Sequence, residues 1–167
     1  FFYLFKTNSK NITEDKNLEE TTYNSNTIKD VNYMANDVGG NTYIIDAKEG
    51  EIDINDSNII YLTDVKALIK LNNTNNINIT SKFGKYNISS FDTIFSKNVV
   101  IKYLDNKITG EYLDFSINRN SMIISRNVIY SNKEDILESD VIEVNIKTKD
   151  TKIFMHESNK KVNIKSI

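Results

Sequence analysis

The chain has 167 residues, which is enough to bury a hydrophobic core and is typical of one domain with an appendage. Its formal net charge is −2 and it contains no run of Lys or Arg, so its charge gives no reason to expect nucleic acid as a partner. It contains no cysteine, which excludes disulfides and thiolate metal sites.

The first five residues, Phe1 to Phe5, are apolar or aromatic, and Lys6 follows them. Five residues are too few to span a bilayer, which needs about 20. Aromatic residues and Lys favour the membrane interface, so we expect residues 1–5 to be the end of an N-terminal transmembrane anchor. A short buried strand is the alternative interpretation.

Residues 6–30 are mostly polar and keep neither a helical nor a strand period over most of their length, which predicts a polar linker. A first strand is expected over Ile28 to Met34, where the linker ends. Gly39, Gly40 and Asn41 then predict a turn.

From Thr42 onward, apolar and polar residues alternate in short stretches, as in Ile52-Asp53-Ile54 and Phe115-Ser116-Ile117. Clusters of Asn, Asp, Ser and Gly separate these stretches. A period of two with regular turns predicts antiparallel strands, and the many Ile, Val and Thr residues suit a pleated sheet. No stretch of helical length keeps a helical period.

The strands also repeat along the chain. Small residues spaced 34, 29 and 29 positions apart mark the starts of the units: Ala47, Ser81, Gly110 and Ser139. Apolar residues recur five and seven positions after each start. A polar residue followed by Val recurs after the first three starts, as Asp64-Val65, Asn98-Val99 and Asn127-Val128. Such a period indicates stacked β units that bury a continuous core together, although generic β-alternation is the alternative.

This unit resembles the OstA-type repeat of the LptA and LptC family of lipopolysaccharide-transport proteins. The residues that carry the resemblance are Ile45-Asp46-Ala47 with Asp64-Val65, Ile79-Thr80-Ser81 with Asn98-Val99, and Ile108-Thr109-Gly110 with Asn127-Val128. The apolar start and the polar linker resemble the LptC branch, whose members are single-pass inner-membrane proteins. The LptA branch is soluble after signal cleavage.

The resemblance implies an all-β fold, an open twisted antiparallel β-jellyroll built from OstA-type repeats over residues 31–167. Two apolar sheet faces in a V would hold lipid acyl chains, at about 0.8 kcal/mol for each buried methylene. The implied location is the inner membrane of a Gram-negative bacterium, with this domain in the periplasm.

The resemblance also implies partners. They are lipopolysaccharide, the inner membrane through the N-terminal helix, the LptB–LptF–LptG ABC transporter, and LptA through an exposed C-terminal edge strand. That edge is expected around Val144 to Met155, because unpaired backbone groups allow another protein to add a strand.

The apolar positions of the repeat are the candidate lipid-binding residues, with an ordinary sandwich core as the alternative. They are Ile52, Ile54, Val65, Ala67, Tyr86, Ile88, Val99, Ile101, Phe115, Ile117, Val128, Val144 and Ile146. The alternation predicts that Phe115 faces inward and that its neighbour Ser116 faces outward.

No catalytic, metal-binding or cofactor site is predicted, and we do not expect an enzyme. His156 is the single histidine, and neither a nucleophile elbow nor a second metal ligand of the usual kind accompanies it. The stretch Asp53 to Asp56 lacks the glycine and the terminal Glu of an EF-hand loop.

Three functional hypotheses follow. The first is an inner-membrane-anchored bridge that passes lipopolysaccharide from the ABC transporter to a periplasmic jellyroll protein. The second is a soluble, LptA-like periplasmic carrier. The third is a β-repeat structural or adhesion module that binds no lipid, which a fully closed core would favour.

Overall fold

The computed structural model describes residues 27–37, 39–72, 75–157 and 159–166. All regular elements among these residues are strands, as the sequence predicts. They are β1 (Thr27–Asn36), β2 (Thr42–Ile52), β3 (Ile59–Lys70), β4 (Ile77–Asn87), β5 (Thr93–Tyr103), β6 (Asn106–Ser116), β7 (Ser121–Ser131), β8 (Asp135–Asn145), β9 (Thr151–Phe154) and β10 (Asn163–Ser166). The predicted anchor over residues 1–5 and most of the predicted linker lie outside the described residues.

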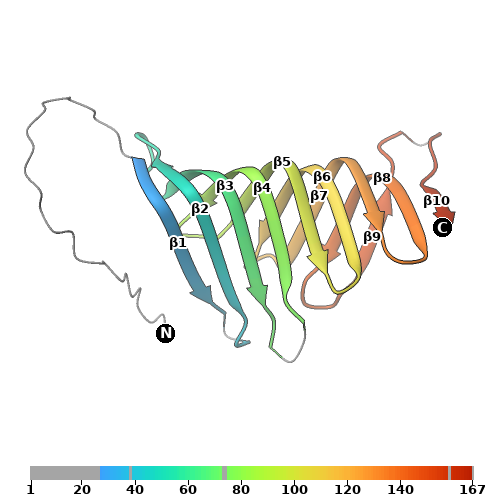
Figure 1. Ribbon diagram of the computed structural model, residues 1–167, viewed down its shortest axis with the longest axis horizontal. Coiled ribbons are helices and arrows are strands. Elements are labelled where there is room, and N and C mark those ends of the chain that lie inside the picture. Colours follow the sequence, from blue (N-terminus) through green and yellow to red (C-terminus); the bar gives the residue numbers. More distant parts are fainter. Residues whose placement is uncertain (1–26, 38, 73–74, 158, 167) are drawn as a thin grey trace, which may run out of the picture.

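The strands form one antiparallel sheet in which β1 to β8 follow each other in sequence order (Figure 1). Beyond β8 the edge is shared, because β10 pairs with Asp135–Glu138 and β9 pairs with Val141–Val144. Every pairing is antiparallel, and short turns connect consecutive long strands. The predicted open all-β fold is therefore confirmed.

A change in the pleat divides each long strand into two halves. In β3 the buried residues are Ile60 and Leu62, and then Val65, Ala67 and Ile69. Side chains of a regular strand alternate between faces, so a step of three residues from Leu62 to Val65 keeps both halves buried on the same side. The same three-residue step recurs in the even strands, from Ala47 to Gly50, Ser81 to Gly84, Gly110 to Leu113 and Ser139 to Ile142.

The polar residue of the sequence repeat lies at this step. Asp64, Asn98 and Asn127 each have a φ of 54°, in the left-handed region that Asn and Asp tolerate better than most residues. In β5 and β7 an extra residue makes a β-bulge, and Lys97 and Arg126 there stack on Phe83 and Tyr112 of the neighbouring strands.

The small residues of the repeat lie opposite the Val that follows each step. Val65 is aligned with both Ala47 and Ser81, Val99 with Gly110, and Val128 with Ser139. A Cβ added at Gly110 would lie 2.9 Å from Cγ1 of Ile124, so a larger side chain has no room there. The repeated residues therefore mark the positions in the sequence at which the sheet bends.

The bend gives the sheet two walls, which we name by their residues. Wall A contains residues 31–36, 42–47, 65–70, 77–81, 99–103, 106–110, 128–131 and 135–139, and β10 extends it. Wall B contains residues 27–29, 50–52, 59–62, 84–87, 93–96, 112–116, 121–125 and 141–145, and β9 extends it. The buried residues of both walls form one hydrophobic cluster. Figure 1 shows the strands following one another along the long axis of the molecule.

Candidate functional site: an apolar cleft between the two walls

The cleft lies between the first strands of wall A and the middle strands of wall B. Wall A contributes Tyr33, Ala35, Tyr43, Ile44, Ile45, Ala67, Ile69 and Ile79. Wall B and its turns contribute Tyr86, Phe91, Thr93, Phe95, Phe115 and Ile117. The strands that face each other are not neighbours in the sheet, so the cleft depends on the bend and twist of the whole sheet.

Two aromatic pairs join the walls across the cleft. The ring centroids of Tyr33 in β1 and Tyr86 in β4 are 5.1 Å apart. Those of Tyr43 in β2 and Phe115 in β6 are 6.0 Å apart. Both distances are typical of attractive aromatic contacts, which are worth about 0.5–1.5 kcal/mol beyond the area they bury. These contacts hold the walls together without any backbone hydrogen bond.

The cleft is almost closed in this state. Its cavity volume is about 20 Å³, which is room for about one water molecule. Burial, with a smaller contribution from Tyr33, raises the pKa of Tyr86 to about 12. A ligand larger than a water molecule therefore fits only if the walls move apart and the aromatic pairs separate.

A polar loop lies at one rim of the cleft. The carboxylate of Asp37 accepts hydrogen bonds from the backbone N–H of Gly39 and Asn41, from the Asn41 amide at 2.7 Å and from the Tyr43 hydroxyl at 2.9 Å. Burial opposes ionisation of Asp37, but these donors outweigh it and lower the pKa of Asp37. The loop therefore holds Tyr43 in place from the solvent side.

The candidate lipid-binding residues divide into four groups. Ala67, Tyr86, Phe115 and Ile117 line the cleft. Val65, Val99, Ile101 and Val128 are buried elsewhere in the core. Ile52, Ile88, Val144 and Ile146 are partly buried against it. Ile54 is 87% exposed, so it contributes to neither the core nor the cleft.

The exposure of Ile54 follows from its position in the series of turns. The N–H of Ile88 bonds to the carbonyl oxygen of Asn58 at 2.8 Å, and the N–H of Ile146 bonds to that of Asn120 at 2.8 Å. Each turn thus lies against the preceding turn of the series, and that preceding turn covers its Ile. Ile54 is in the first turn of this series, so no preceding turn of the series covers it in the described part of the chain.

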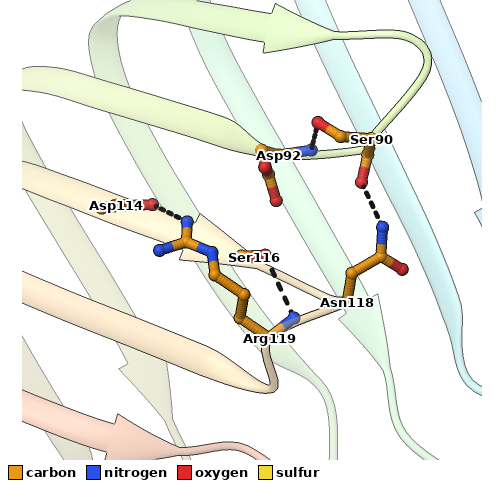
Figure 2. Close-up of polar contacts among 6 residues, drawn as sticks. All are labelled: Ser90, Asp92, Asp114, Ser116, Asn118 and Arg119. Carbon is orange, nitrogen blue, oxygen red and sulfur yellow. Dashed lines mark hydrogen bonds and ion pairs between the residues drawn. The ribbon is translucent and has the colours of Figure 1, made fainter.

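The turns of wall B also carry a polar network, shown in Figure 2. The Asn118 amide donates to the Ser90 carbonyl oxygen at 2.9 Å, and the Arg119 guanidinium pairs with Asp114 at 2.9 Å. The backbone N–H of Arg119 donates to the Ser116 hydroxyl at 3.2 Å. Ser116 is fully buried under this turn, so this position, predicted to face outward, is not exposed to solvent.

Several cleft residues are absent from the sequence-based candidates. Tyr33 lies in the predicted first strand, ahead of the repeat, and Tyr43 precedes the first repeat start. Thr93 and Phe95 are alternate residues in the half of β5 that precedes Asn98-Val99. The alternation of Tyr43, Ile45 and Ala47, all buried, was the signal that could have identified Tyr43.

The described residues contain no group of three or more His, Asp or Glu side chains that could hold a metal ion. His156 is exposed, and its backbone N–H donates to the carboxylate of Asp140 at 2.9 Å. No helix long and apolar enough to cross a membrane occurs in the part of the chain that the structure describes.

Comparisons with known proteins agree with this architecture. A family model described as "Lipopolysaccharide-assembly, LptC-related" matches residues 1–166. The fold is similar to that of LptH from Pseudomonas aeruginosa, described as the LptA homologous periplasmic component of the lipopolysaccharide transport device. That likeness has a TM-score of 0.55 at 9% identity and covers 75% of this chain and 93% of that one. No curated protein matches the sequence.

Proposed function

Because the chain belongs to the LptC-related family of lipopolysaccharide-assembly proteins, we propose that it holds lipopolysaccharide acyl chains between walls A and B. Family membership and the fold support a non-enzymatic role in lipopolysaccharide transport in the periplasm. The observation that carries the proposal is the cleft itself. Its two apolar walls meet there through side chains alone, so a lipid can replace those contacts without breaking the sheet.

The energetics suit a carrier that must also release its cargo. Each methylene that leaves water for the cleft contributes about 0.8 kcal/mol, whereas separating the two aromatic pairs costs part of that gain. The net gain in free energy is then modest for an acyl chain that is only partly inserted. An energy source outside this chain would drive the movement, in keeping with an ATP-driven transporter as the donor.

In the proposed pathway an N-terminal helix anchors the protein in the inner membrane, and the domain lies in the periplasm. The LptB–LptF–LptG transporter delivers lipopolysaccharide, and an LptA jellyroll accepts it at the C-terminal edge. The exposed side chains of Ile153 and Phe154 in β9 and of Ile164 in β10 support an apolar docking edge there.

Site-specific photo-crosslinking in cells tests lipid binding. A photoreactive residue at Tyr86 or Phe115, both inside the cleft, is expected to form a lipopolysaccharide adduct when the transporter is co-expressed. Lys85 is the matched control, because it precedes Tyr86 in β4 and is exposed. Adducts of equal yield at Lys85 and Tyr86, or none at either inner position in folded protein, would contradict the proposal and favour the structural-module hypothesis.

A second candidate is a soluble periplasmic carrier, which the structural likeness to LptH favours. Membrane fractionation of the product of the complete gene separates the two candidates. Retention in the membrane after an alkaline carbonate wash supports the anchored bridge, whereas release with the periplasmic fraction supports the soluble carrier.

A further inference from the structure

One polar side chain interrupts the apolar inner face of wall B. The aligned positions across β3 to β7 nearest the turns are Ile60, Tyr86, Thr93, Phe115 and Met122. Thr93 is 1% exposed, and its hydroxyl has no hydrogen-bond partner in the described part of the chain. The row of side chains thus contains a buried hydroxyl on a residue that lines the cleft.

Packing alone does not account for this hydroxyl. Buried polar groups are normally hydrogen-bonded, since an unpaired one costs free energy. The Ser139 hydroxyl is also unpaired, but Ser139 occupies the bend opposite Val128, where the repeat has small residues. Thr93 lies in a row of large side chains away from the bend, where Val would have the same shape.

The position of Thr93 fits a ligand atom. Its aligned neighbours, Tyr86 and Phe115, are the wall B members of the two aromatic pairs. Thr93 therefore lies between the contacts that hold the walls together, and its side chain is smaller than the aromatic rings on either side. It is the first residue of β5, so it lies at the turn end of wall B, away from the bend. We take the space between the turn ends of the two walls as the mouth of the cleft.

Building on the proposed function, we infer that Thr93 selects acyl chains that carry an oxygen atom near their polar head. The Thr93 hydroxyl donates to a hydroxyl or carbonyl oxygen of the bound chain. The oxygen must be close to the head because the head stays in water at the mouth, a few carbons from Thr93. A plain hydrocarbon segment at this point would leave the hydroxyl unpaired.

The test compares two probes, dodecanoic acid and 3-hydroxydodecanoic acid, which share chain length and carboxylate. Their Kd values are measured by calorimetry on the 167-residue wild-type chain, on Thr93→Val and on Thr93→Ser. The ratio of the Kd for the plain acid to that for the hydroxy acid is expected to fall about fivefold in Thr93→Val, which corresponds to one neutral hydrogen bond. Thr93→Ser retains the donor and is expected to keep the wild-type ratio.

Three results would overturn the inference. An unchanged ratio in Thr93→Val would show that the hydroxyl does not contact the probe. An equal loss in Thr93→Ser would assign the effect to side-chain volume. Failure of the wild-type chain to bind either acid would also remove support for acyl binding in the cleft, whereas binding without the expected change in ratio would leave that function intact.

Discussion

At the scale of a single residue, the packing of Tyr86 changes the pH at which its phenol titrates. Its ring contacts Tyr33 across the cleft, and burial raises its pKa to about 12 from the ordinary value of 10.0. The folded protein therefore keeps the phenol proton at a pH where the unfolded chain releases it. The stabilising contribution is complete below pH 10 and is lost as pH rises toward 12.

We expect Tyr86→Phe to weaken this alkaline loss of stability. Phe keeps the ring contact but has no proton to release, so its free energy of unfolding should fall less between pH 10 and pH 12. The difference from wild type should be on the order of 1 kcal/mol at the upper end. Urea denaturation at pH 8, 10 and 12 measures it, and parallel curves for the two proteins would contradict the expectation.

At the scale of the strand, the left-handed residue at each bend is the sensitive position. Asn98 is exposed and has a φ of 54°, so its identity affects the backbone more than the packing. Asn98→Val should destabilise the protein by about 1–2 kcal/mol, because a β-branched side chain disfavours this conformation. Asn98→Gly should be nearly neutral, and equal urea midpoints for the two variants would argue against backbone strain.

The bends could be predicted from the sequence only in part. The spacing of small residues and of the polar-Val pairs predicted the repeat, because a bend constrains side-chain size and φ at fixed positions. Asp30-Val31 is a further such pair, with a φ of 53° at Asp30, but it lies where the polar linker was predicted to end. The repeat spacing also predicted Ile54 as an inward residue, although no preceding turn of the series covers it in the structure.

The cleft itself could not be derived from local patterns. Tyr33 meets Tyr86 and Tyr43 meets Phe115 only because the sheet bends and twists over several strands. Ala67, Tyr86, Phe115 and Ile117 were predicted as inward residues, and alternation alone is enough for that. An inward residue can contact either the opposite wall or the bend, depending on the angle between the walls. That angle cannot be read from the local sequence pattern.

At the scale of the whole molecule, stability is expected to be uneven along the sheet. From β1 to β8, each strand forms its backbone ladders with its sequence neighbours, as in other repeat architectures. β9 and β10 have four residues each, all exposed, and pair only with β8. Their amides should exchange with deuterium at least about tenfold faster than those of β4 and β5, because local opening there costs little. Equal protection in native-state exchange would contradict this picture.

The two ends of the sheet differ, because β9 and β10 share the edge beyond β8 whereas β1 alone forms the opposite edge. At the other end β1 has residues in both walls, so one continuous strand limits how far they separate. Among the described residues, wall A ends in β10 and wall B in β9, and no ladder joins these two strands. The aperture at the β9–β10 end can therefore widen by bending β8 alone. Under the proposed function, an acyl chain is then confined least at the end where we propose that a receiving protein docks.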